Sequence, residues 1–158
     1  MFFYLINGGE KIKMMNCEQV LESVRKQGIN LSSVRNQTRE ICLEAVKHDG
    51  WALRFVKEQT LEVCREALKE SIGALQFVKD IEHVEILSKE FDILYLPINN
   101  PYKLESLMIS NGKCWLGFNE GITVEALIEY IYKCDGGLEK HPERQVYLDF
   151  LKENGLIQ

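Results

Sequence analysis

Three basic side chains recur at an interval of 22 residues and are the clearest candidates for a binding site. They are Arg35, Lys57 and Lys79. In a chain that repeats at this interval, they would line up along one edge and could contact an acidic partner or a phosphate backbone. Acidic residues match them less regularly than they match the second basic set described below. We therefore predict that this basic ladder (Arg35, Lys57, Lys79) binds a partner.

A second basic set has the same interval but carries its own counter-charges. Each member follows a glutamate by three residues, which on a helix places the two side chains next to each other. The predicted pairs are Glu22–Arg25, Glu44–Lys47 and Glu66–Lys69. We interpret this set as a solvated, self-neutralised face.

The five cysteines and three histidines give no pattern typical of a catalytic or metal site. The cysteines are widely spaced without a C-x-x-C pair, and the histidines form no H-x-x-x-H or H-E-x-x-H motif. A nucleophile pair of Cys114 or Cys134 with His141 is conceivable, but nothing in the local sequence supports it. We predict that the protein is not an enzyme and binds no cofactor or metal.

The two tryptophans differ in their predicted roles. Trp51 takes the place of Ile29 and Gly73 at matched positions, which are positions related by multiples of 22 residues, and this favours a core role. Trp115 lies near Phe118 on an expected hairpin. Aromatic side chains dominate binding hot spots, so Trp115 and Phe118 are predicted partner-binding residues.

The segments that must position these residues have a repeating sequence. Residues 38–57 and 60–79 follow one pattern without a gap, and residues 16–34 carry a weaker third copy. A fixed interval of this length marks a repeat fold, in which each unit buries its apolar face by stacking on a neighbour.

Each copy is predicted to be a longer helix, a turn and a shorter helix. The N-caps of the longer helices lie at matched positions: Asn16, Thr38 and Thr60. Gly28 and Gly50 would end two of these helices in a left-handed conformation. The shorter helices are expected at residues 51–57 and 73–79, and helices of this length need packing to be stable.

Residues Ile41–Val56 and Val63–Val78 resemble a family of unknown function built from short tandem helical repeats. The shared pattern is E-V-C-L-E-A-V-K-x-x-G-x-A-L-x-x-V, from which the second segment departs at Ile72. Residues 19–34 fit more loosely, because Ser23 and Ser33 replace apolar residues. The resemblance covers roughly residues 16–80 and implies a helical-repeat scaffold, with no activity or catalytic residue to transfer.

The segments on either side of the repeats have other signatures. Residues 1–15 are predicted to be a hairpin that caps the first repeat, with a frayed leader as the alternative. The repeats and one further helix occupy residues 16–92. Residues 93–158 are predicted to be an acidic module with a hairpin at Asn111-Gly112 and two helices, the first capped by Thr123 and the last opened by Pro142. The predicted fold class is mainly α: a short α-solenoid-like array with a small α+β or irregular C-terminal module.

Composition and charge limit the classes of function. Residues 1–80 carry 12 basic and 11 acidic side chains, whereas residues 81–158 carry 7 basic and 13 acidic ones, within a net charge of −5. The acidic half argues against nucleic-acid binding there, because phosphate contact needs lysine and arginine. The chain lacks an apolar run long enough for a membrane span, and its unpaired cysteine pattern indicates a reduced, cytoplasmic protein.

These features together predict a non-enzymatic protein-interaction module whose partner is another protein. The acidic half suggests a regulator or inhibitor of a nucleic-acid-binding protein. The alternatives are a nucleic-acid-binding protein that uses the ladder, and an enzyme of a type that the motifs do not reveal.

Overall fold

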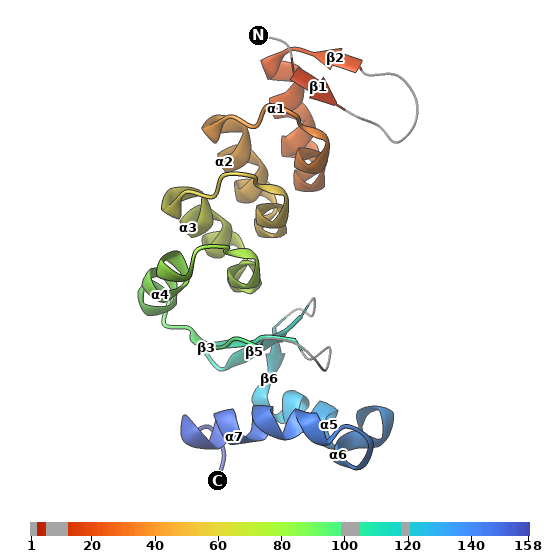
Figure 1. Ribbon diagram of the computed structural model, residues 1–158, viewed down its shortest axis with the longest axis vertical. Coiled ribbons are helices and arrows are strands. Elements are labelled where there is room, and N and C mark those ends of the chain that lie inside the picture. The colour runs from red at the N-terminus through yellow and green to blue at the C-terminus, as the bar shows by residue number, and fades with distance from the viewer. Residues whose placement is uncertain (1–2, 6–12, 99–104, 118–120) are drawn as a thin grey trace. The chain divides into compact units, whose positions relative to one another are not determined.

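The computed structural model describes residues 3–5, 13–98, 105–117 and 121–158 (Figure 1). In this part the chain is mainly helical, with a small antiparallel sheet in its C-terminal half. It divides into two compact units, residues 1–87 and 88–158.

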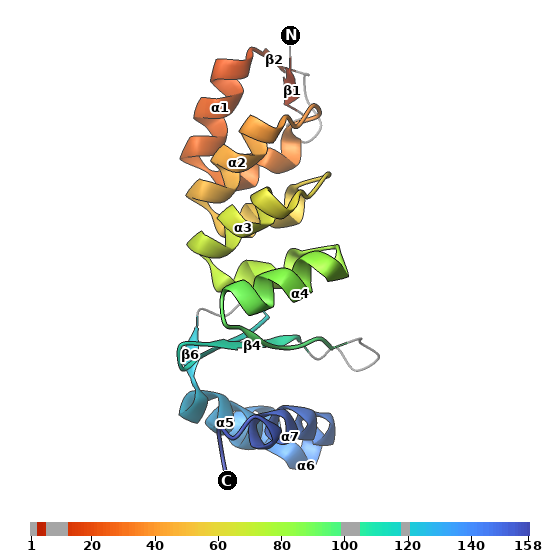
Figure 2. The ribbon, with the colours of Figure 1, turned by 90° about the vertical axis from the view of Figure 1, so that its left-hand side faces the viewer.

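The first unit contains a series of equally long helices that begin 22 residues apart. They are α1 (Cys17–Lys26), α2 (Arg39–His48) and α3 (Leu61–Glu70). A 3-10 helix follows each of them: η1 (Gly28–Ser33), η2 (Gly50–Phe55) and η3 (Ile72–Phe77). In Figure 2, α1 packs against α2 and α2 against α3, and the 3-10 helices pack in the same order.

The starts of the three helices are fixed by the N-caps that the sequence predicts. Asn16 Oδ1 accepts a hydrogen bond from Gln19 N–H (2.8 Å), and Gln19 Oε1 accepts one from Asn16 N–H (3.1 Å). The Oγ1 atoms of Thr38 and Thr60 each accept from the N–H three residues later, at 3.3 Å. An N-cap of this kind stabilises a helix by about 1 kcal/mol, and these three predictions are confirmed.

Matched positions of the three copies bury similar side chains. The buried sets are Val20, Cys42 and Cys64; Val24, Val46 and Leu68; and Leu31, Leu53 and Leu75, none more than 4% exposed. Full burial of a valine or leucine contributes about 1.5–3 kcal/mol. Packing between neighbouring copies, rather than the intrinsic stability of ten-residue helices, therefore holds this unit together.

The first copy replaces one apolar pair by a polar pair. Ala45 and Ala52 in the second copy correspond to Ser23 and Asn30 in the first. Asn30 Nδ2 donates to both Ser23 O and Ser23 Oγ, each at 3.0 Å. This satisfied pair explains how the weaker copy adopts the same local structure.

The shorter elements are 3-10 helices rather than the helices predicted at residues 51–57 and 73–79. Both run for six residues and end at a valine in an extended conformation, Val56 and Val78. Short connectors of this length commonly close with i→i+3 hydrogen bonds. The prediction located the elements but placed their ends two residues too late.

Gly28 and Gly50 do not end helices in a left-handed conformation, so that prediction is wrong. Neither has a positive φ, and each begins a 3-10 helix instead. A Cβ added at Gly50 would lie 2.5 Å from Ala67 O of the next helix, and one at Gly28 would lie 3.0 Å from Ala45 O. These glycines are required for the close approach of neighbouring copies.

The third copy carries Ile72 at the glycine position because the segment after it differs. α4 (Ile81–Glu90) begins 20 residues after the start of α3, rather than 22, and makes few contacts with it. The close approach of the next helix is therefore not repeated, and a large side chain is tolerated at Ile72.

The N-terminal segment contains two paired strands, β1 (Phe3–Leu5) and β2 (Lys13–Met15), which are antiparallel with Tyr4 opposite Met14. They correspond to the two arms of the predicted hairpin. The residues that connect the two arms, 6–12, lie outside the described residues.

The second unit is built on an antiparallel sheet in the order β3-β4-β5-β6. Its strands are β3 (Leu94–Leu96), β4 (Leu107–Ser110), β5 (Lys113–Leu116) and β6 (Ile122–Thr123). Asn111 and Gly112 connect β4 to β5 with φ angles of 50° and 71°. Positive φ at both residues is what a type I′ hairpin turn requires, so the hairpin prediction is confirmed.

Two helices share a core with this sheet. α5 (Val124–Lys133) begins at the predicted cap Thr123, whose Oγ1 accepts from Ala126 N–H (3.2 Å), and α7 is Gln145–Glu153. Between them lie η4 (Cys134–Gly136), α6 (Gly137–Lys140) and η5 (Pro142–Arg144). Pro142 thus opens a 3-10 turn rather than the last helix. The core includes Leu107, Ile109, Leu116, Leu127, Ile131, Tyr147 and Leu151.

Tyr147 ties α7 to the segment before β4. Its Oη donates to Glu105 O (2.7 Å) and accepts from Glu105 N–H (3.0 Å). Burial raises the pKa of the Tyr147 phenol to about 12. The side chain therefore acts as a protonated, hydrogen-bonded core group at neutral pH.

We expect the stability of the second unit to fall as the pH rises from about 10 to about 12. In this range a tyrosine in the unfolded chain loses its proton whereas Tyr147 in the folded protein keeps it, so unfolding is favoured as the pH rises. Tyr147→Phe should lower the free energy of unfolding by about 1 kcal/mol at neutral pH, because its hydrogen bonds are lost. The same substitution should reduce the loss of stability at alkaline pH, because phenylalanine has no proton to lose. Urea unfolding across this pH range measures both effects; an equally steep loss in the variant would assign it to other groups.

Candidate functional site

The basic ladder lies where the 3-10 helices end. Lys57 Nζ donates to Arg35 O at 2.8 Å. In the next copy, Lys79 Nζ donates to Val56 O at 2.8 Å and to Lys57 O at 3.4 Å. Each ammonium group thus reaches the backbone of the copy before it, and the three exposed side chains form consecutive rungs.

These contacts give the lysines a structural role in addition to any binding role. An ammonium group has three donors, and Lys57 directs two of them at Arg35 O and Val34 O (3.5 Å). One donor is left for solvent or a ligand. Arg35, the first rung, forms no side-chain hydrogen bond or ion pair with any residue that the structure describes.

Gln37 and Gln59 form hydrogen bonds with the backbone next to the ladder residues, and they were not identified from the sequence. Gln59 Nε2 donates to Leu53 O and Phe77 O (both 3.0 Å), and its Oε1 accepts from Lys79 N–H (3.0 Å). Gln37 repeats this arrangement one copy earlier. Their shared residue type at an interval of 22 was the signal that could have identified them, since each amide joins two successive copies.

A pocket of about 250 Å³, the ladder pocket, opens between the first two rungs. Its charged lining residues are Arg35, Arg39, Lys57 and Glu58, and the others are Gln37, Cys42, Thr60 and Val63. Arg39 is already bound by Glu62 through hydrogen bonds of 2.6 and 2.8 Å. The positive character of the pocket therefore comes mainly from Arg35 and Lys57. Arg39 has no basic counterpart at matched positions, so the repeat could not reveal it.

Two members of the second basic set form ion pairs, and one of them does so with its predicted partner. The pair Glu66–Lys69 is confirmed at 2.6 Å. The pair Glu22–Arg25 is wrong: α2 packs beside α1 and brings Glu44 to Arg25 (2.7 Å), and Glu22 pairs with Lys26 instead (2.8 Å). Glu44 is therefore not the partner of Lys47 among the described ion pairs. Exposed pairs of this kind contribute at most about 1 kcal/mol each.

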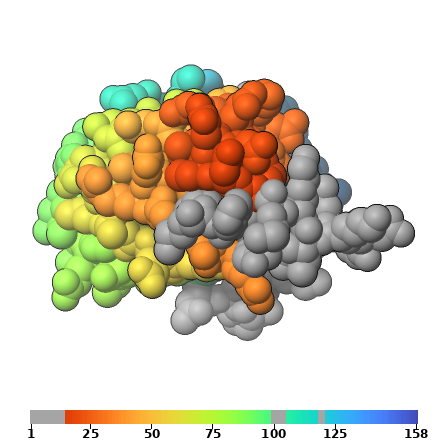
Figure 3. All heavy atoms as spheres, turned by 90° about the horizontal axis from the view of Figure 1, so that it is seen from above, coloured from red at the N-terminus to blue at the C-terminus, as the bar shows by residue number. Residues whose placement is uncertain are grey.

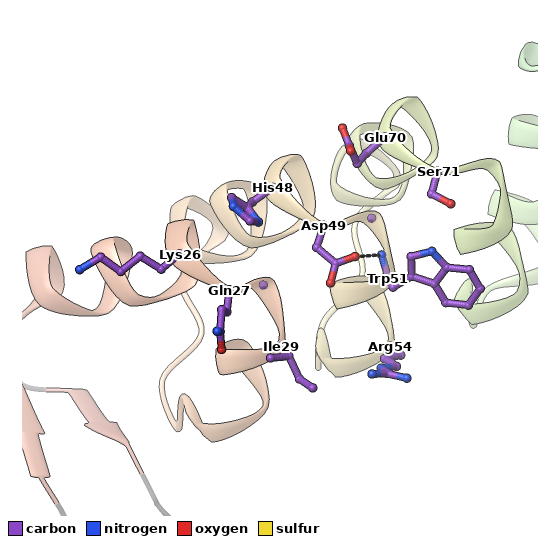
Figure 4. A pocket seen from close by; sticks show the side chains of 11 residues that line it. Lys26, Gln27, Ile29, His48, Asp49, Trp51, Arg54, Glu70 and Ser71 are labelled. Carbon is purple, nitrogen blue, oxygen red and sulfur yellow. Dashed lines mark hydrogen bonds between the residues drawn. The ribbon is translucent and has the colours of Figure 1, made fainter. Parts of the chain in front are cut away.

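A wider groove of about 530 Å³ lies at the C-terminal ends of the helices (Figure 4). Trp51 lies at this groove, with its ring edge-on to Phe77 at a centroid distance of 5.4 Å. Asp49 Oδ1 accepts from Trp51 N–H at 2.9 Å. Trp51 is half-buried and packs against Phe77 of the next copy, so it takes part in the packing between copies while also lining the groove. The groove carries no net charge, because Lys26 and Arg54 are offset by Asp49 and Glu70.

Of the two predicted aromatic partner-binding residues, the structure describes one, Trp115. Trp115 belongs to the second unit, where it lies on β5 opposite Met108 and is half-buried. A Cβ added at Gly121 would lie 2.9 Å from the indole ring, so the ring packs against this glycine. Phe118 lies outside the described residues.

The conceivable cysteine–histidine pair is not formed in the part of the chain that the structure describes. Cys114 is fully buried in the sheet core, and burial raises the pKa of its thiol to about 11. Cys134 is exposed, and His141 Nδ1 lies 3.1 Å from Glu143 Oε1. Among the described residues, His, Cys, Asp and Glu side chains form no group that could hold a metal ion.

Neither a family model, a curated protein nor a solved structure matches this chain. The resemblance of residues 16–80 to a helical-repeat family therefore stays a prediction. Within the described ranges, none of the helices has the length and apolar character needed to cross a lipid bilayer.

Proposed function

We propose that the protein is a non-enzymatic interaction module in which residues 16–92 form a short α-solenoid-like array that binds another protein. The support is the equal spacing of α1, α2 and α3 and the burial of like side chains at matched positions. Arrays of this type present extended surfaces on which residues recur copy by copy. Figure 3 shows the first unit from its N-terminal end, with the orange, yellow and green segments emerging in turn beside one another.

The observation that carries the proposal is the row of exposed cations at the ladder pocket. The Arg35 guanidinium is without a carboxylate partner in the described part of the chain, and Lys57 lies on the next rung. Glu58 lines the same pocket, but cations still outnumber anions there, and such an excess of positive charge attracts and orients an acidic surface. The partner is therefore a protein that presents carboxylates.

Nucleic acid is a weaker candidate for the same surface. Lys57 and Lys79 each spend donors on backbone carbonyls, and Arg39 is paired with Glu62. Few cations remain for successive phosphates, whereas nucleic-acid affinity depends on many such contacts. The inhibitor role suggested by the acidic residues 81–158 stays a prediction.

Affinity capture from the native cell tests the proposal with the variant R35Q/K57Q/K79Q. Glutamine removes the charge and retains an N–H donor at rungs 57 and 79. We expect the wild type to retain a protein partner whose binding weakens as salt is raised, and the variant to lose it. The control K113Q/K133Q/K152Q removes the same charge from exposed positions of the second unit. Recovery of the same proteins by all three chains would contradict the proposal.

A further inference from the structure

The ladder has a period that restricts the shape of its partner. Its rungs belong to successive copies, and Lys57 Nζ and Lys79 Nζ each contact the backbone of the copy before. Packed neighbouring helices lie about 8–10 Å apart, so the rungs are separated by about this distance. An extended segment in the polyproline II conformation advances about 3.1 Å per residue and has three residues per turn, so every third side chain lies on the same face. Three such residues therefore span one rung spacing.

We infer that the ladder binds an extended segment of the partner protein in which every third residue is acidic, one carboxylate to a rung. This inference rests on the proposed function and gives the partner's chemistry. Each rung offers a donor that its structural contacts leave unused: the whole guanidinium of Arg35 and the third ammonium hydrogen of Lys57 and of Lys79. One carboxylate per rung is the simplest arrangement that satisfies them.

The ladder pocket is the place where we expect the first acidic side chain of the segment to bind. Its lining contains the buried side chains Cys42 and Val63, which are 4% and 1% exposed. Its exposed charged residues, apart from the paired Arg39, are two cations, Arg35 and Lys57, and one anion, Glu58. This combination fits a side chain with an apolar stem and an anionic head, such as glutamate. One copy further on, Leu61 takes the position of Arg39, and α4 begins 20 rather than 22 residues after α3, so the residues that line the ladder pocket do not all recur between Lys57 and Lys79. The pocket at the first pair of rungs therefore anchors the segment.

Fluorescence anisotropy with labelled synthetic peptides tests the register. The probes have equal composition and a length of about nine residues, enough to span three rungs. One has glutamate at every third position, and its isomer has the glutamates side by side. A helix-forming peptide with glutamates seven residues apart, which also spans about 10 Å, and a single-stranded oligonucleotide complete the set. The protein is the full chain, as wild type, R35Q, K57Q and the control K113Q.

We expect the every-third peptide to bind at least about threefold more tightly than its isomer, since each mispaired exposed rung loses a modest charge interaction. R35Q and K57Q should each remove this preference, and K113Q should keep it. R35Q guards against a folding artefact, because the Arg35 side chain makes no contact that the described structure depends on. The urea unfolding curves of R35Q and K113Q should coincide with that of the wild type.

The other outcomes separate the inference from the proposed function. Equal binding of the two isomers, or tighter binding of the helical peptide, with loss in R35Q and K57Q, would overturn the extended register but leave acidic-partner binding intact. Tightest binding of the oligonucleotide would overturn both and assign the ladder to phosphate. Absence of peptide binding, together with identical captures by wild type and R35Q/K57Q/K79Q, would overturn both as well.

Discussion

Replacing Gly50 by alanine is expected to lower the free energy of unfolding of the first unit by about 2–3 kcal/mol. The new Cβ would lie 2.5 Å from Ala67 O, which is backbone of the next helix and cannot rotate away. Either α2 and α3 move apart, which loosens the packing of Leu53 and Leu68, or the 3-10 helix shifts. Overpacking of this kind typically costs about 1–3 kcal/mol.

Gly28→Ala serves as the graded comparison for Gly50→Ala. Its nearest added contacts are 2.9 Å to Asp49 Cβ and 3.0 Å to Ala45 O, so smaller movements relieve them and the loss should be about 1 kcal/mol. Urea denaturation of both variants gives the two values. A loss at Gly50 no larger than that at Gly28 would show that the close approach of the copies is not what requires glycine.

Replacing Gln59 by leucine is expected to lower the free energy of unfolding of the first unit by about 3 kcal/mol, which is the second large effect that we expect. The side chain keeps its size, but Leu53 O, Phe77 O and Lys79 N–H all lose their partner at once. A part-buried polar group left without a hydrogen bond costs about 1 kcal/mol or more. Because these groups belong to two successive 3-10 helices, the variant should also weaken protection of η2 and η3 in hydrogen exchange.

Gln27→Leu is the matched control for Gln59→Leu. Gln27 is exposed, and its side chain makes no hydrogen bond within the described part of the chain. Its replacement should change stability by no more than about 0.5 kcal/mol. Equal effects of the two substitutions would mean that the Gln59 amide does not join the copies.

Features that depend on a few neighbouring residues could be predicted from the sequence. The caps Thr38, Thr60 and Thr123 and the turn Asn111-Gly112 are of this kind, because side chain and backbone within one turn decide them. The mainly helical character follows from the same local patterns. Their success says little about how the elements pack.

Features that depend on the distance between copies could not be predicted in the same way. Gly50 looked like a helix-ending glycine, although what selects it is Ala67 O in the next helix. Glu44 was assigned to its own helix but binds Arg25 on the neighbouring one. In both cases the deciding partner lies about 20 residues away, beyond the reach of local rules.

The candidate site was predicted only in outline. The interval of 22 residues identified Arg35, Lys57 and Lys79, and the structure places them on consecutive rungs. It did not show that the lysine ammonium groups would bind carbonyl oxygens, since backbone acceptors have no signature in the sequence. Arg39 was missed because no other basic residue stands at its matched positions, although its partner Glu62 has matched counterparts in Glu18 and Glu40.

Removal of one complete copy tests most directly whether the copies are equivalent, on which the interaction surface depends. Deletion of residues 39–60 joins Thr38 to Leu61 and leaves every remaining residue at its matched position. Deletion of residues 39–55 is the control that shifts them. Hydrogen exchange should show protected amides in both α1 and α3 after the first deletion and not after the second. Loss of protection in α1 and α3 in both chains would contradict the account.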